Sequence, residues 1–209
     1  MNEQISIPVL IFGGFLILMV IIARLAAKYS RKAHNNLCEL SQRLNLKMQE
    51  VKPVLGYYQQ ADLNGEIRGK QVRLYIYTTG TSKSKTTWAA ILVVPREHGG
   101  LTFSITRQGF GSRVKALFGA EEIKVGDEKF DREWFIETNA PDFLAAGLLL
   151  ELQQKIQPHH GNWKLKDGSI IYSEQGSFAD RERCTRFIAI ADAACDLADV
   201  AEVYAKQKQ

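Results

Sequence analysis

The pattern of apolar and polar positions divides the chain into a continuous apolar run, a region of alternating strands and a final helical stripe. Residues 5–23 contain no ionisable side chain. At about 1.5 Å of rise per residue, a helix of this length crosses a hydrocarbon core of roughly 30 Å. A single span must satisfy its backbone hydrogen bonds internally, so a helix is the form expected. We therefore predict a transmembrane helix over residues 5–27.

The charges that flank this run predict its direction. Only residues 1–4 precede it, whereas four cations follow it within about two turns: Arg24, Lys28, Arg31 and Lys32. Positive residues next to a span stay on the cytoplasmic side. We expect a short exported N-terminus at residues 1–4, a single pass and a cytosolic C-terminal part. A cleaved signal peptide is the alternative, but its positive charge would precede the apolar run.

Residues 28–52 combine this basic cluster with an amphipathic helix. Ala33, Leu37, Leu40 and Leu44 recur at helical spacing with polar residues between them. The pattern allows this helix to run on from the span. Asn45 is typical of a left-handed helix end, which places the end of the helix just after Leu44.

Between residues 57 and 108 the period changes from helical to alternating. Residues 71–77 and 101–106 alternate as half-buried strands do, and residues 88–95 form a more continuously apolar run that we place centrally. Asn64-Gly65 and Arg68-Gly69 are both turn sequences, so one should close a hairpin and the other mark a bulge. Short strands at 123–125 and 130–137 would extend this antiparallel meander.

Two helices are expected to cover the sheet. The first follows Pro141 and runs to about residue 156, and the second spans about residues 180–206. Between them, residues 163–172 read as a hairpin with an Asp-Gly turn. We predict an α+β fold in which an N-terminal transmembrane helix precedes an antiparallel meander packed against two helices, with residues 53–209 as one cytosolic domain.

Several short motifs resemble a set of uncharacterised bacterial membrane-anchored proteins. They are G-x-I-R-G-K-x-V at residues 65–72, T-T-W-x-A at 86–90 and G-D-x-x-F-D-x-x-W at 126–134, behind an N-terminal span. The resemblance implies a bacterial inner-membrane setting and a cytosolic α+β domain. It implies no activity, so it assigns no catalytic residue.

Composition adds few candidate functions. The formal net charge of +4 and the pI near 8.9 are modest, and the basic cluster beside the span is explained by topology and anionic lipid, so no nucleic-acid partner is predicted. Cys38, Cys184 and Cys195 lack disulfide or zinc spacing, and Cys184 and Cys195 are interpreted as packing residues. His159-His160 reads as a loop rather than a metal pair. We expect no cofactor and no metal.

The loop over residues 79–87 is the candidate anion site, through Thr81, Ser82, Lys83 and Lys85. A phosphate-binding loop needs a second glycine and a following helix, and strands flank this loop instead. A solvated hairpin tip is therefore favoured. A pocket that joined the loop to Asp131 or to a histidine would support the anion site.

Two clusters of acidic residues have both a structural and a functional interpretation. Four carboxylates crowd residues 127–133, and we read them as a charged strand entrance because calcium-loop spacing is absent: Asp127, Glu128, Asp131 and Glu133. Asp192, Asp196 and Asp199 lie off the apolar stripe of the last helix. They read as a solvated face, with a basic partner as the alternative.

The glycine-bounded segment 109–119 is the candidate lipid-surface element. It combines aromatic and basic side chains that suit a membrane interface, namely Phe110, Arg113, Lys115 and Phe118. The alternative is that Leu117 and Phe118 cover an edge of the core.

The predicted function is a membrane-anchored cytosolic interaction or assembly module, a non-catalytic subunit of a membrane protein complex. The basis is that no nucleophile, base or metal ligands converge in the sequence. The expected partners are the lipid bilayer and a membrane protein. The alternative is a membrane-associated hydrolase, or a domain that binds a phosphate ligand at the 79–87 loop or a lipid between sheet and helix.

Overall fold

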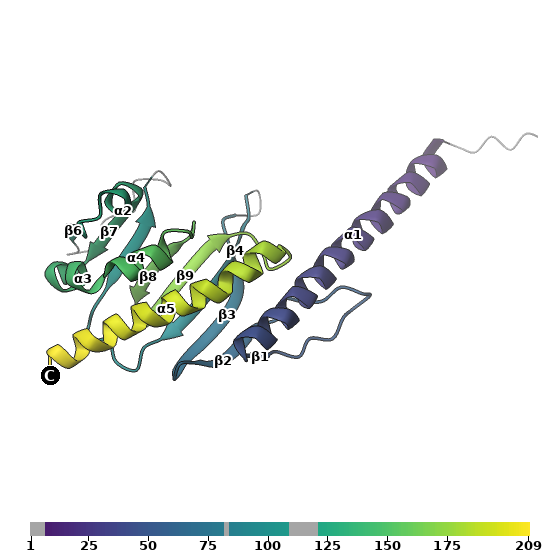
Figure 1. Ribbon diagram of the computed structural model, residues 1–209. Helices are drawn as coiled ribbons and strands as arrows, with labels where there is room; N and C mark the ends of the chain where they lie inside the picture. Colours follow the sequence, from purple (N-terminus) through teal and green to yellow (C-terminus); the bar gives the residue numbers. More distant parts are fainter. Residues whose placement is uncertain (1–6, 82–83, 109–120) are drawn as a thin grey trace, which may run out of the picture.

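The computed structural model describes residues 7–81, 84–108 and 121–209 (Figure 1). Within them the helices are α1 (Ile7–Leu44), α2 (Glu128–Glu133), α3 (Pro141–Gly147), α4 (Leu150–Ile156) and α5 (Arg181–Gln207). The strands are β1 (Lys47–Met48), β2 (Leu63–Ile67), β3 (Lys70–Thr79), β4 (Thr86–Val94), β5 (Phe103–Arg107), β6 (Glu121–Ile123), β7 (Trp134–Thr138), β8 (Asn162–Lys166) and β9 (Ser169–Gln175). This confirms the predicted α+β fold behind a long apolar helix.

Helix α1 is continuous from an exposed apolar half to a half that packs into the domain. Figure 1 shows its N-terminal half projecting away from the rest of the molecule, and the apolar side chains from Ile11 to Leu25 are exposed there. Its C-terminal half packs into the body, where Leu37 and Leu40 are buried. The amphipathic helix therefore does run on from the apolar segment, and Asn45 ends it at φ 53° as predicted. Among the described helices, α1 is long and apolar enough to cross a membrane.

The described strands form one antiparallel sheet in the order β1-β2-β3-β4-β9-β8-β5-β7-β6. The predicted meander is right from β2 to β4, and the apolar strand β4 is interior as expected. It is wrong at residues 101–106, because β9 and β8 lie between β4 and β5. The β8–β9 hairpin then pairs with β4 through β9 and with β5 through β8, so it joins the two parts of the sheet. Its Asp-Gly turn has Asp167 at φ 52° and Gly168 at φ 74°, the conformation that such turns adopt.

Helices α3, α4 and α5 lie on one face of the sheet (Figure 1). Helix α5 crosses β4 and β9 and also contacts α1 and α4. Its apolar stripe, including Phe187, Ile190 and Leu197, is fully buried against inward-facing strand residues such as Ile91 and Tyr172. The core therefore lies between this face and α5, and it includes the end of α1.

Three local predictions are wrong. Residues 130–133 belong to helix α2 rather than a strand, because Asp127 caps its first turn by accepting a hydrogen bond from Phe130 N at 2.8 Å. The helix predicted from Pro141 to residue 156 is broken into α3 and α4 at Leu148 and Leu149.

The third error concerns the bulge. Arg68-Gly69 closes the β2–β3 hairpin, but Gly65 lies in β2 with unbroken register opposite Val72. A Cβ at Gly65 would lie 2.9 Å from Leu46 Cδ2, so this glycine allows close approach of the chain after α1.

Candidate interaction surface and polar pocket

The face of the sheet opposite α5 carries a row of aromatic side chains. In β3 the alternation buries Val72 and Leu74 toward α5 and turns Tyr75 and Tyr77 to the opposite face. Trp88 of β4 pairs with Tyr77 across the strands and shares that face. All three aromatic side chains are partly exposed.

These side chains support one another. The Tyr77 and Trp88 rings stack with centroids 6.3 Å apart, and the Tyr75 and Tyr77 centroids are 5.9 Å apart. The Arg73 guanidinium lies 5.1 Å from the centroid of the Tyr75 ring. Trp88 Nε1 donates to Thr79 Oγ1 at 2.8 Å, which fixes the indole. Tyrosine, tryptophan and arginine are the side chains enriched at the energetic centres of protein interfaces.

The row leads to a polar pocket of about 320 Å³ at one end of the sheet. Trp88 lies near the start of β4, opposite Gln175 at the end of β9 and close to the start of β8, because neighbouring strands run in opposite directions. The pocket is lined by Trp88, Arg107, His160, Gly161, Asn162, Ser173, Glu174, Gln175, Arg183 and Arg186. Within the described part of the chain, none of these lining residues lies in the 79–87 loop, so the pocket does not join that loop to a histidine.

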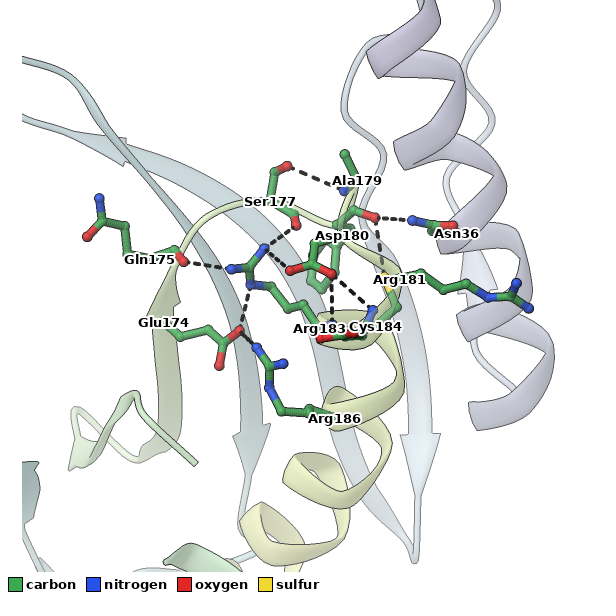
Figure 2. Close-up of polar contacts among 12 residues, drawn as sticks. Asn36, Glu174, Gln175, Ser177, Ala179, Asp180, Arg181, Arg183, Cys184 and Arg186 are labelled. Carbon is green, nitrogen blue, oxygen red and sulfur yellow. Dashed lines mark hydrogen bonds and ion pairs between the residues drawn. The ribbon is translucent and has the colours of Figure 1, made fainter. Parts of the chain in front are cut away.

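The buried carboxylate of Glu174 lines this pocket, and Figure 2 shows the two arginines that pair with it. Glu174 Oε1 accepts from Arg183 Nε at 2.6 Å and from Arg186 Nη2 at 2.8 Å. Tyr172 Oη donates to Glu174 Oε2 at 2.7 Å, and burial together with this carboxylate raises the pKa of the phenol. Both arginines of α5 pair with Glu174, and Arg183 also lies 3.5 Å from Asp180, so these ion pairs fix the start of α5 to β9.

Arg183 also ties down the loop between β9 and α5. It donates to the carbonyl oxygens of Gln175 and Ser177 at 3.0 and 2.8 Å (Figure 2). Gly176, at φ 125°, permits this, since a Cβ there would lie 2.5 Å from the guanidinium carbon. Asn36 of α1 donates to the Phe178 carbonyl at 2.8 Å in the same loop. The loop that Arg183 holds is thus bonded directly to α1.

Arg107 and His160 form the opposite rim. Their side chains are in contact, and Arg107 also reaches Glu133 at 3.3 Å. The guanidinium lies 5.9 Å from the Trp134 ring centroid. The adjacent His159 points the other way, into the core beside Trp163, and burial lowers its pKa to about 4. The two histidines therefore do not converge.

The aspartates on the acidic face of α5 form ion pairs with cations of the same chain. Arg68, in the β2–β3 turn, donates to Asp196 at 2.6 Å and to Asp192 at 3.1 Å. Lys155 of α4 lies 2.6 Å from Asp196 and 2.7 Å from Asp192. The hydrogen bond from Lys155 lowers the pKa of Asp192. The interpretation as a freely solvated face is therefore incomplete.

Lys70 extends this network toward the C-terminal part of α5. It lies 2.5 Å from Asp199 and 3.4 Å from Glu202. Its side chain is buried, and burial opposes its charged form, but the two carboxylates outweigh burial and raise its pKa.

The carboxylates near residue 130 cap local structure. Asp131 accepts from the backbone N–H groups of Val125 and Gly126 at 2.8 and 3.1 Å, and Asp127 caps α2. The predicted charged strand entrance is a helix start instead. Within the described residues, no group of three or more His, Cys, Asp or Glu is arranged to hold a metal ion.

The predicted site residues lie apart from the pocket. The cations Arg24, Lys28, Arg31 and Lys32 are exposed on α1, and Thr81 and Lys85 are exposed on the β3–β4 hairpin. Ser82, Lys83, Phe110, Arg113, Lys115 and Phe118 lie outside the described residues. Burial raises the pKa values of Cys184 and Cys195 to about 11, which suits packing residues.

Sequence reasoning missed the pocket residues. One signal was present, because the β9 alternation places Glu174 on the same face as Ile170 and Tyr172. A carboxylate at a core-facing position requires cationic partners. Arg183 and Arg186, about one helical turn apart near the start of the last helix, were candidates for these partners.

No protein-family model and no curated protein sequence matches the chain. A crystal structure of the mycobacterial trehalose monomycolate transport factor A, TtfA, is similar, with a TM-score of 0.51 and 7% sequence identity. The similarity covers 82% of this chain and 93% of that chain. At this identity it concerns the fold alone, so the chain shares the architecture of that transport factor.

Proposed function

We propose that this chain is an accessory subunit of a membrane protein complex, anchored by α1 in a bacterial inner membrane with its domain in the cytosol. The observation that carries the proposal is the continuity of α1, whose exposed apolar half and buried amphipathic half form one helix. Such a helix fixes the domain relative to the membrane. A similar fold in a transport factor is compatible with an accessory role.

The aromatic row is the surface we assign to the protein partner. Tyr75, Tyr77 and Trp88 are partly exposed on the face opposite α5, and they are ordered by stacking before any partner binds. Side chains that are already ordered lose little conformational entropy on binding. The chemistry expected of the partner is a flat apolar patch with acceptors for the Tyr75 and Tyr77 hydroxyl groups, since Arg73 is already paired with Asp62.

Photo-crosslinking in native membranes tests this assignment. A benzophenone amino acid replaces Tyr77 in the full-length chain, and a matched chain carries it at Val203, which is exposed on α5. We expect one membrane protein to crosslink from position 77 and not from position 203. The absence of a crosslink at 77, or identical products at both positions, would contradict the assigned surface.

The proposed orientation has its own test. The cations Arg24, Lys28, Arg31 and Lys32 follow the apolar segment, and such residues favour the cytoplasmic side. A C-terminal fluorescent fusion that matures only in the cytosol should be bright, and a phosphatase fusion that is active only outside should be silent. The reverse pattern would contradict the topology while leaving the partner surface open to test.

A second candidate is a phosphate-bearing ligand, which could be held in the pocket by Arg107 and His160 or separately by the exposed 79–87 loop. Pyrophosphate titrated into the detergent-solubilised full-length chain should change Trp88 fluorescence. Arg107→Ala should remove the response if the pocket binds the anion. Lys85→Ala should remove it if the exposed loop does so. No response in the parent chain would exclude this candidate for pyrophosphate.

A further inference from the structure

The segment between β1 and β2 runs beside the exposed part of α1 (Figure 1). Tyr58 N donates to Ser30 Oγ at 3.1 Å, and the Tyr58 ring stacks on His34 with centroids 4.1 Å apart. A Cβ placed on Gly56 would lie 3.9 Å from Ala27 Cβ. This segment therefore extends along α1 toward the apolar half of the helix and is fixed to it.

The tip of the segment is a closed turn that exposes apolar side chains. Val54 and Tyr57 exchange two backbone hydrogen bonds of 2.9 Å, with Leu55 at φ 50° and Gly56 at φ 78° between them. Leu55 is 99% exposed, Val54 is 64% exposed and Tyr57 is also exposed. A turn with two left-handed central residues favours Asn or Gly at the first of them. Leucine at position 55 is therefore unfavourable for the backbone, and its side chain is not buried within the domain.

The tip lies at the level where the apolar segment ends. Ala27 follows Arg24 by three residues, a distance of about 4.5 Å along the helix axis. The polar interfacial layer on each side of a bilayer is about 5 to 7 Å thick. If Arg24 marks the edge of the hydrocarbon core, the turn next to Ala27 falls within that layer.

The charges around the tip suit the same environment. Lys52 is exposed on the segment, and Lys28 and Arg31 are exposed on the adjoining part of α1. Exposed apolar side chains surrounded by cations are the combination that binds the boundary between acyl chains and anionic headgroups. In water alone, the apolar surface of Val54, Leu55 and Tyr57 would stay hydrated, which is unfavourable.

We propose that the Val54–Tyr57 turn inserts into the interfacial layer of the leaflet in which the apolar segment ends. The domain then contacts the membrane at two points, α1 and this turn, which prevents it from rotating about the axis of α1. The inference rests on α1 crossing the membrane but not on the protein partner or on the direction of insertion, so it can fail separately from them.

Tryptophan placed at the tip reports on this contact. The full-length Leu55→Trp chain is reconstituted in vesicles of phosphatidylcholine and phosphatidylglycerol, with and without bromine on the acyl chains. The parent chain supplies the background of Trp88, Trp134 and Trp163. Leu149→Trp is the matched control, because this leucine is 68% exposed at the junction of α3 and α4, away from α1.

We expect the emission added by Leu55→Trp to shift to shorter wavelength and to lose most of its intensity in brominated lipid. The emission added by Leu149→Trp should show neither change. The proposal is overturned if the tryptophan at position 55 emits as a solvated indole that brominated lipid leaves unchanged. Equal quenching at both positions also overturns it, because the whole domain would then lie on the bilayer. Unchanged unfolding midpoints verify that both variants are folded.

Discussion

The two long helices of this chain expose opposite kinds of surface. Over its N-terminal half, α1 exposes apolar side chains such as Phe12 and Phe15, with no described element packed over them. Helix α5 buries its apolar stripe and exposes Asp192, Asp196 and Asp199, which pair with cations of the same chain. The charges on the exposed face of α5 are therefore largely paired within the protein. The exposed apolar face of α1 suits an apolar environment rather than water.

The difference shows which exposed groups indicate a contact with a partner or a membrane. A basic partner is the alternative interpretation of the three aspartates, but Arg68, Lys70 and Lys155 of the same chain already pair with them. Among the described residues, the exposed apolar groups on α1 and on the turn beside it have no such internal counterpart. External contacts are accordingly assigned to apolar and aromatic surfaces, and not to the acidic stripe.

The largest predicted effect contrasts a phenylalanine from each helix. Phe187 of α5 is fully buried, with ring centroids 5.0 Å from Phe178 and 5.8 Å from Tyr172. Phe187→Ala should lower the free energy of unfolding by about 3 to 5 kcal/mol because it leaves a cavity in the core. Phe15→Ala, at a side chain that is 56% exposed, should leave it unchanged.

Urea unfolding of the full-length chain in mild detergent, followed by tryptophan fluorescence, measures both values. Trp163 reports on this layer because its ring centroid lies 4.5 Å from that of Tyr172. Equal destabilisation by the two substitutions would mean that the apolar half of α1 packs against the domain, and the contrast between the helices would fail.

The fold was predictable where a periodic pattern extends over many residues. The helices α1 and α5 and the β8–β9 hairpin follow from apolar spacing and turn glycines, which are local signals. The placement of β9 beside β4 was not predictable, because pairing between distant strands depends on which apolar faces meet in space. The sequence 141–156 continues a helical pattern through Leu149, although the helix is interrupted there between α3 and α4.

The candidate site was less predictable than the fold for the same reason. Trp88, Arg107 and Glu174 come from three strands that meet only when the sheet is complete. No spacing in the sequence relates them. The acidic residues at 127–133 were misread because a short capped helix and an alternating strand differ little over seven positions.

Protonation of His159 gives the next largest effect and acts on the core beneath α5 without affecting the apolar half of α1. Burial lowers its pKa from 6.5 to about 4, opposed by Glu174 and reinforced by Arg186 and His160. As pH falls below 6.5, the unfolded chain binds a proton that the folded chain excludes, so stability falls until about pH 4. Between pH 7.5 and pH 5 this histidine should cost about 2 kcal/mol.

His159→Phe tests the assignment, since it keeps an aromatic ring beside Trp163 and removes the titrating group. Urea unfolding at the two pH values should show a smaller loss of stability at pH 5 for the variant than for the parent. A variant with the parent's full pH dependence would place the responsible group elsewhere.

The smallest effect tests whether the acidic stripe of α5 is satisfied internally. Asp196→Asn removes a carboxylate shared by Arg68 and Lys155, and Glu50→Gln is a control at an exposed acid for which no ion pair is found in the described residues. Because these charges are partly exposed, we expect a loss of about 1 kcal/mol for Asp196→Asn and none for Glu50→Gln. Salt at high concentration should reduce the loss, since it screens exposed pairs. If the two variants unfold alike, the stripe contributes nothing within the chain, and α5 would join α1 in carrying a face that needs an external partner.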